Sequence, residues 1–330
     1  MGIKIIATGR YLPRNIVTND DFTGIVDTSD EWISQRTGMK ERHIASGEPT
    51  WLMGELAARD ALESGGIDPL SIDLILVTSV TPDYMTPSAA CIIQGRIGAA
   101  NAACIDLNAA CAGFVYALDM ARRYLCFDDV RRVLIVSAEE LSKITDYTDR
   151  ASCVLFGDAA GAVVVEAADT PFASVIGADG TGAPLLYAKS PAVNENPFRK
   201  PELAPEYEEI IHAKNHFLYM DGREVYKFAV KIMPHAVQEA CDKLGVPVEA
   251  IDLLVPHQAN VRIVDTAVKT LGLPPERVYV NLAKHGNVSS ACIPLCLDEI
   301  NKGGLIQPGR RIALVGFGAG LTYASAIFTW

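Results

Sequence analysis

The sequence predicts an α/β protein assembled from two similar halves. Short runs rich in Val, Ile and Leu, typical of buried strands, alternate with amphipathic segments typical of helices. This alternation predicts helices packed on the faces of a sheet. In addition, segments of the first half recur in the same order in the second half. A chain of 330 residues is long enough for such an arrangement.

The expected elements follow one another along the chain. Strands are predicted within residues 1–10 and at 73–80, 133–137, 251–256 and 311–316. Helices are predicted near 51–64, 87–97, 112–125, 222–243, 260–271 and 288–301.

Two pairs of segments support a duplication. The strand that starts at Asp73 matches the strand that starts at Asp252. The Gly-rich segments 154–163 and 314–323, each interpreted as a strand pair, follow later in their own halves. We therefore assign residues 1–172 and 173–330 to the two halves and expect a site at the seam between them.

Residues 181–215 interrupt the pattern, because this region is rich in Pro, Glu and Asn. It is predicted to be a surface loop that connects the halves. Loops of this length are uncommon unless they cover a site or move. The sequence leaves a solvated linker and a lid as alternatives.

Composition excludes several classes of function. The chain is 49% hydrophobic and 21% charged, which indicates a packed globular protein rather than a disordered one. A net charge of −11 disfavours nucleic acid as a partner. We find neither a signal peptide nor the roughly 18 continuous apolar residues that a membrane span needs, and we expect a cytoplasmic protein without membrane contact.

The eight cysteines contain no CxxC pair, which disfavours zinc and redox motifs, and no metal site is expected.

Cys111 differs from the other cysteines in its position in the sequence. It follows a predicted strand within the small-residue segment 109–113 and precedes an apolar helix. A thiol at a helix N-terminus faces free backbone N–H groups, which favour the nucleophilic thiolate.

Two further polar residues lie at comparable junctions. His257 follows Pro256 at the end of a predicted strand, where ligands collect in open α/β sheets. Asn287 stands at the start of the helix predicted near 288–301, where Asn also serves as an ordinary helix cap.

Six segments in order resemble the β-ketoacyl-acyl carrier protein synthase III family of the thiolase superfamily. They are Asp27-Thr-Ser-Asp-Glu-Trp-Ile-Ser-Gln-Arg-Thr-Gly38, Asn108-Ala-Ala-Cys-Ala-Gly-Phe114, Asp149-Arg-Ala-Ser-Cys-Val-Leu-Phe-Gly-Asp158, Pro256-His-Gln-Ala-Asn260, Gly286-Asn-Val-Ser-Ser290 and Gly316-Phe-Gly-Ala-Gly-Leu-Thr322. The resemblance covers essentially the whole chain and implies a thiolase-like fold with five layers, α-β-α-β-α.

The resemblance implies a Cys-His-Asn triad of Cys111, His257 and Asn287. Cys111 would take an acyl group from coenzyme A, and a malonyl-acyl carrier protein would then lose CO2 and form the new carbon–carbon bond. The backbone N–H groups of Cys111 and Ala319 would form the oxyanion hole. The family usually has glycine where Ala319 stands, and the donor is retained if Ala319 has a negative φ.

The resemblance also implies binding residues. Coenzyme A, a substrate and not a cofactor, would contact Thr28, Trp32, Arg36, Arg150, Gly222 and Asn260, with Trp32 and Arg150 on either side of the adenine.

The resemblance also implies that acidic acyl carrier protein docks on Arg262, Lys227 and Lys269. The family is homodimeric, and Thr86 would border the partner's primer pocket, where a large aromatic residue is common. The smaller Thr86 predicts longer or branched primers.

Other functions remain open at this point. A related enzyme of secondary metabolism would keep the triad but use another acceptor. A cysteine hydrolase of acyl thioesters would use Cys111 and His257 but leave Asn287 unexplained. A non-catalytic scaffold would have no need for the three reactive residues.

Overall fold

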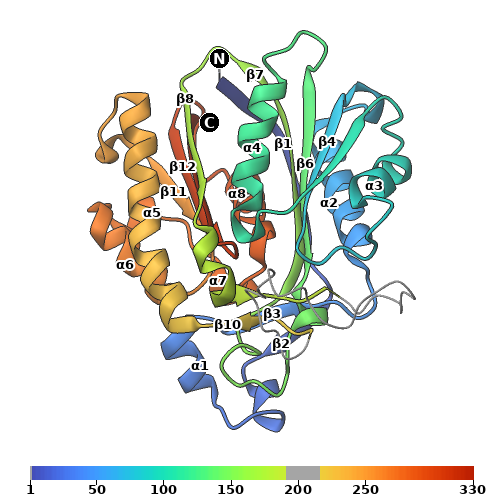
Figure 1. The fold of residues 1–330 in the computed structure, drawn as a ribbon. Coiled ribbons are helices and arrows are strands. Elements are labelled where there is room, and N and C mark those ends of the chain that lie inside the picture. The colour runs from blue at the N-terminus through green and yellow to red at the C-terminus, as the bar shows by residue number, and fades with distance from the viewer. Residues whose placement is uncertain (1, 191–215) are drawn as a thin grey trace, which may run out of the picture.

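A computed structural model describes residues 2–190 and 216–330 (Figure 1). Two sheets dominate the structure, and each belongs to one half of the chain. In spatial order the first sheet contains β1 (Gly2–Tyr11), β7 (Asp158–Ala168), β6 (Arg132–Glu140), β4 (Leu74–Thr78) and β5 (Ala103–Leu107). The second contains β11 (Leu253–Pro256), β12 (Arg311–Gly318), β13 (Thr322–Thr329) and β8 (Phe172–Ala178).

Three pairs of long helices alternate with the sheets. The pairs are α2 (Thr50–Gly65) with α3 (Ala89–Ile97), α4 (Gly113–Tyr124) with α8 (Cys292–Lys302), and α5 (Gly222–Leu244) with α6 (Val261–Leu271). Apolar residues of α2 and α3 cover the outer face of the first sheet, and those of α5 and α6 cover the outer face of the second. Helices α4 and α8 pack between the sheets, so the predicted five-layered α-β-α-β-α fold is confirmed (Figure 1).

The smaller elements lie around the ends of the sheets. They are the antiparallel pair β2 (Asn15–Thr18) and β3 (Glu41–Ile44), the pair β9 (Leu186–Tyr187) and β10 (Tyr219–Met220), and the short helices α1 (Asp30–Thr37) and α7 (Leu282–His285). Within the described residues, none of the helices combines the length and the apolar character that crossing a membrane requires.

The parallel strand pairs of the two halves, β4–β6 and β11–β12, repeat each other with an offset of 179 residues. Leu74 of β4 pairs in parallel with Val133 of β6, and Leu253 of β11 pairs in parallel with Ile312 of β12. In both halves an antiparallel strand, β7 or β13, then lies next to β6 or β12. The predicted duplication is therefore present in the strand pairing itself.

One detail of that prediction is wrong. Segment 314–323 is a strand pair, because it spans the end of β12, a turn and the start of β13. Segment 154–163 is instead a turn followed by the single strand β7. The sequence similarity comes from the glycines near the start of β7 and of β13. In the first half, the strand that precedes β7 and pairs with it is β6, which ends at Glu140.

The predicted loop 181–215 begins differently from the expectation. A 3-10 helix occupies Gly180–Leu185, and β9 then pairs antiparallel with β10. The remaining residues, 191–215, lie outside the described part of the chain, so the alternatives of linker and lid stay open.

We predict that Gly9→Ala lowers the free energy of unfolding by about 1–3 kcal/mol. Gly9 lies in β1 against α2, and an added Cβ would stand 2.2 Å from the Ala61 nitrogen. Gly95→Ala in α3 is the matched control, because a methyl group there meets nothing within 4 Å. It should raise the free energy of unfolding by up to about 1 kcal/mol. Guanidinium unfolding curves measure both, and equal midpoints for the two variants would contradict the packing described.

Candidate active site

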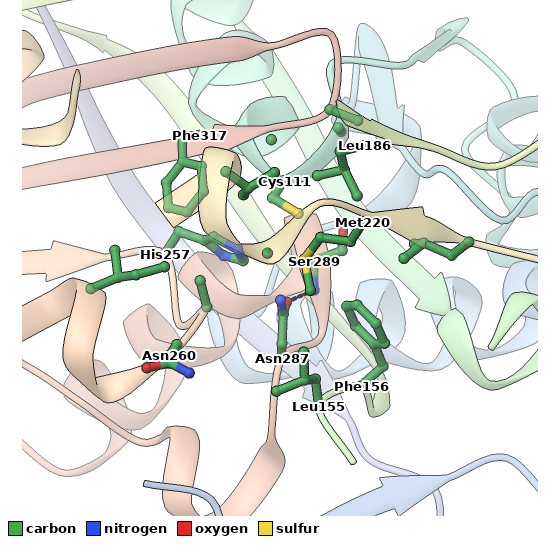
Figure 2. A pocket seen from close by; sticks show the side chains of 18 of the residues that line it. Cys111, Leu155, Phe156, Leu186, Met220, His257, Asn260, Asn287, Ser289 and Phe317 are labelled. Atoms are coloured by element: carbon green, nitrogen blue, oxygen red, sulfur yellow. Dashed lines mark hydrogen bonds between the residues drawn. The ribbon is translucent and has the colours of Figure 1, made fainter. Parts of the chain in front are cut away.

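A cavity of about 1120 Å³ opens between the two halves (Figure 2). Cys111, His257 and Asn287 all line it, so the structure brings the three predicted residues together. Figure 2 shows the Cys111 sulfur, the His257 ring and the Asn287 amide directed into the same space. Apolar side chains that include Phe156, Leu186 and Phe317 form much of the surrounding wall (Figure 2).

Cys111 lies in a tight turn, residues 108–112, between β5 and α4; we call it the Cys111 turn. Ala110, just before the cysteine, has φ = +47°, a value that is unusual for a residue with a side chain. The backbone N–H of Ala110 donates to Asn108 Oδ1 at 3.2 Å. This turn presents the thiol at the start of α4, as the sequence indicated.

The end of β12 approaches this turn closely. A Cβ added to Gly318 would stand 2.5 Å from the Cys111 nitrogen, so no side chain fits there. Ala319, the next residue, lines the cavity and does not have positive φ. Because its φ is not positive, the Ala319 N–H can remain a hydrogen-bond donor toward the site.

Asn287 belongs to a second turn of the same kind, residues 287–291, which we call the Ser290 turn. It precedes α8 as the Cys111 turn precedes α4. Ser289 has φ = +49°, and its N–H donates to Asn287 Oδ1 at 2.9 Å. Because the amide oxygen is occupied, the Asn287 NH2 group is the part left to donate into the cavity (Figure 2).

His257 follows β11 and is almost completely buried, with 1% of its surface exposed. Its backbone N–H donates to the Val315 carbonyl at 2.7 Å, and its ring lies edge-on to Phe317 at 5.6 Å. Within the described chain, the buried Nδ1 has no hydrogen-bond partner. The imidazole is thus held by packing.

Burial controls the charge of both groups. It raises the pKa of the Cys111 thiol to about 12, although Ser289 acts in the opposite direction. It lowers the pKa of His257 to about 3. Our expectation that the helix start favours thiolate is therefore wrong, because the cost of desolvating the charge is larger. At neutral pH both side chains are uncharged.

Four of the six predicted coenzyme A residues line the cavity. The Arg36 and Arg150 guanidinium carbons lie 4.7 and 4.2 Å from the centre of the Trp32 ring. Stacked layers stand about 3.5 Å apart, so an adenine between Trp32 and Arg150 requires Arg150 to move outward. Trp32, Arg36, Gly222 and Asn260 line the cavity, whereas Thr28 and Arg150 do not.

Asn260 has a structural role in addition to its position on the cavity. Its Oδ1 accepts the Arg262 N–H at 2.9 Å and caps α6. Its Nδ2 donates to the Arg36 carbonyl at 3.1 Å, which ties α6 to α1. A ligand that used this amide would have to compete with these bonds.

The predicted docking residues separate into two groups. Arg262 and Lys227 are exposed on the cavity rim, and Lys227 is paired with Glu224 at 2.6 Å. Lys269 lies about two turns along α6 from Arg262, away from the rim. Thr86 is exposed and does not line the cavity of its own chain.

The sequence did not single out three other residues. Arg223 lines the cavity as a further cation. Ser289 has the positive φ that orients Asn287, a feature that no composition rule identifies in serine. Glu139 is completely buried, and its charge also raises the pKa of Cys111.

Comparisons with known proteins identify similar chains. Residues 105–190 match the family described as 3-oxoacyl-[acyl-carrier-protein (ACP)] synthase III, and residues 241–330 match its C-terminal counterpart. The chain is 48% identical to beta-ketoacyl-[acyl-carrier-protein] synthase III of Clostridium acetobutylicum, over 99% of this chain and 98% of that one.

Solved structures are also similar. The 3-oxoacyl-[acyl-carrier-protein] synthase III of Aquifex aeolicus is 39% identical, with a TM-score of 0.90 and 100% of both chains covered. That of Thermus thermophilus is 45% identical, with a TM-score of 0.90 and coverage of 100% of this chain and 99% of that chain.

We predict that iodoacetamide labels Cys111 slowly at pH 7 in the unliganded protein. Only the thiolate reacts, and its fraction rises about tenfold per pH unit below the pKa. With a pKa of about 12, the rate should still be rising at pH 10. Peptide mapping follows the labelling, with the exposed Cys126 as an internal reference for reagent reactivity. A Cys111 rate that levels off below pH 8 would contradict the raised pKa of the thiol.

Proposed function

The chain belongs to the 3-oxoacyl-[acyl-carrier-protein] synthase III family, and we propose that it carries out the condensation that initiates type II fatty acid synthesis. The substrates are an acyl-CoA and malonyl-acyl carrier protein. The products are β-ketoacyl-acyl carrier protein, coenzyme A and CO2. The observation that carries the proposal is the convergence of Cys111, His257 and Asn287 on one cavity between the halves.

In the first step the Cys111 sulfur attacks the thioester carbonyl of the acyl-CoA. The tetrahedral oxyanion accepts hydrogen bonds from the N–H groups of Cys111 and Ala319, beside the space that Gly318 leaves open. The bond to the coenzyme A sulfur then breaks. The proton of the Cys111 thiol ends on coenzyme A, and the acyl group remains on Cys111.

In the second step the malonyl carboxylate leaves as CO2, and its bonding electrons form an enolate on the carrier-protein thioester. The enolate oxygen accepts hydrogen bonds from the Asn287 NH2 group and from neutral His257, in the tautomer protonated on Nε2. The enolate carbon attacks the acyl-Cys111 carbonyl. Cys111 leaves, and a proton from water restores its thiol.

The C-terminal glycine-rich turn favours decarboxylation over direct deprotonation. Thiolases remove a proton from acetyl-CoA with a second cysteine in this turn, whereas residues 316–320 contain none. Neither step as written requires a metal or a redox cofactor, and coenzyme A takes part as substrate.

The surroundings of the cavity support the partners. Arg36, Arg223, Lys227 and Arg262 make its mouth basic in an otherwise acidic chain, which suits coenzyme A phosphates and an acidic carrier protein. We assign Arg262 and Lys227 to docking, with Lys269 as an outer contact. The expected compartment is the cytoplasm.

We further propose a homodimer. β5 is the outermost strand of the first sheet and leaves one edge unpaired by the described strands. Tyr84 and Met85, which precede Thr86, are 53% and 90% exposed, as expected for side chains that a partner covers. In such a dimer Thr86 would border the partner's primer pocket.

The direct test combines the purified protein with acyl-CoA and malonyl-acyl carrier protein and follows CO2 and β-ketoacyl-acyl carrier protein. Equal amounts of both products support the proposal. Free fatty acid without CO2 release would indicate a thioester hydrolase. Transfer of the acyl group to another acceptor, with malonyl-acyl carrier protein inert, would indicate an enzyme of secondary metabolism.

We predict that His257→Ala and Asn287→Ala separate the two steps. Loss of one enolate donor should lower the condensation rate by about 10²–10³-fold, because the donor stabilises charge in a buried site. Acylation of Cys111 should change much less, which intact mass spectrometry measures. His235→Ala on the exposed face of α5 is the control. Equal losses in both steps would argue against the role of these donors.

We predict that the wild-type protein uses branched or medium-chain acyl-CoA as well as acetyl-CoA. Thr86→Phe should lower kcat/KM for the larger primers at least about tenfold and change acetyl-CoA little, because a larger side chain shortens the partner's pocket. Steady-state kinetics with a primer series measure this. A strict acetyl preference of the wild type would refute the role of Thr86.

A further inference from the structure

Glu139 is a completely buried acid near the end of β6. Its carboxylate accepts five hydrogen bonds. Oε1 accepts from Ser290 Oγ at 2.6 Å and from Ser290 N–H at 3.3 Å. Oε2 accepts from Val80 N–H at 3.0 Å and from the hydroxyls of Thr81 and Ser79 at 3.2 and 3.4 Å. Burial raises the pKa of Glu139, and the hydrogen-bond donors that surround both oxygens act in the opposite direction by stabilising the carboxylate.

The internal repeat shows which residues of the two halves correspond to Glu139 and Ser290. With the offset of 179 residues, Ser290 is the counterpart of Cys111, and Glu139 is the counterpart of Gly318. Gly318 of the second half leaves open the space against the Cys111 N–H. Glu139 of the first half fills the equivalent space against the Ser290 N–H. Its carboxylate therefore stands where a substrate oxygen would lie at the active turn.

The rest of this second turn is closed as well. Thr78, the counterpart of His257, places its hydroxyl 3.0 Å from Ser290 Oγ. Gly113 of α4 packs on both residues, since an added Cβ would stand 3.2 Å from Thr78 and 3.4 Å from Ser290. No substrate can enter here, so the Ser290 turn serves the reaction through the residues it holds.

Asn287 is the residue that this turn holds. Its backbone is fixed by residues 155–157, through its N–H to the Leu155 carbonyl and its carbonyl to the Gly157 N–H. Its amide oxygen is fixed by the Ser289 N–H. Ser289 keeps φ = +49° only while its neighbours constrain it, and Glu139 holds the next residue by both N–H and hydroxyl.

We propose that Glu139 is a positioning residue for the bond-forming step: it occupies the Ser290 turn as an internal oxyanion and thereby keeps the Asn287 NH2 group directed at the enolate. This inference rests on the proposed function. Without the Glu139 carboxylate, Ser289 relaxes toward negative φ and its N–H turns away from Asn287. The Asn287 side chain then loses the hydrogen bond from Ser289 to its Oδ1, which keeps its NH2 group and not its oxygen facing the cavity.

The test is Glu139→Gln, which keeps the shape of the side chain but replaces one carboxylate oxygen with an NH2 group. That NH2 group then faces the N–H and hydroxyl donors that the oxygen accepted from. We expect the condensation rate to fall about tenfold to a hundredfold, because a buried donor loses its acceptor. Acylation of Cys111 by acyl-CoA should change less than about threefold. Glu140→Gln is the control, since that carboxylate pairs with Lys143 at 3.0 Å. It should leave both steps unchanged.

A double-mutant cycle distinguishes positioning from general loosening. Glu139→Gln should add little to the condensation defect of Asn287→Ala if it acts through Asn287. Additive losses, or equal losses in acylation and condensation, would overturn the proposal. If E139Q fails to fold, Ser290→Ala removes the hydroxyl bonds to Glu139 and Thr78, keeps the N–H bond to Glu139, and should still slow condensation selectively. A wild-type protein that does not condense refutes the proposed function, whereas a condensing wild type with an unimpaired E139Q or S290A refutes only this inference.

Discussion

The active site depends on two tight turns that meet between the sheets. In each turn an Asn side chain accepts the N–H of a residue with positive φ, Ala110 in one and Ser289 in the other. The turns face each other because α4 and α8 share the central layer and begin at the same end. One turn presents the nucleophile Cys111, and the other presents the donor Asn287. A shift of either helix would separate the two groups, and the buried core around both helices opposes such a shift.

Burial decides what chemistry these groups can perform. A thiol with a pKa of about 12 and an imidazole with a pKa of about 3 carry no charge at neutral pH. Charge therefore develops only during reaction, on the thioester oxygen or the enolate, where neutral donors already point. In a dry site such donors stabilise an anion more than they would in water. At the closed counterpart of the site, burial also raises the pKa of Glu139, and the hydrogen-bond donors around its carboxyl oppose that effect.

Much of this arrangement was predictable from the sequence. Strand ends and helix starts placed Cys111, His257 and Asn287, because these junctions have local patterns of small residues, Pro and Asn. The charge state of Cys111 was not predictable, since desolvation depends on side chains far away in sequence. Glu139 was missed for a similar reason: an acid in the segment Ser137-Ala-Glu-Glu140 looks like a solvated strand end until its distant partners Val80 and Ser290 are known. The β9–β10 pair was missed because Leu186–Tyr187 lies in a region whose composition suggested a loop throughout, and its partner Tyr219–Met220 is distant in sequence.

The role of Cys111 as the acyl carrier in a decarboxylating condensation is tested by measuring how fast its acyl group is consumed. The protein would be loaded with acyl-CoA, mixed rapidly with malonyl-acyl carrier protein and quenched at intervals. Intact mass spectrometry and peptide mapping would follow the adduct, and released CO2 would be counted in parallel. We expect one acyl group on Cys111 that disappears at the rate at which CO2 and β-ketoacyl product appear. An adduct on another residue, or CO2 release that leaves the Cys111 adduct in place, would contradict this role of Cys111.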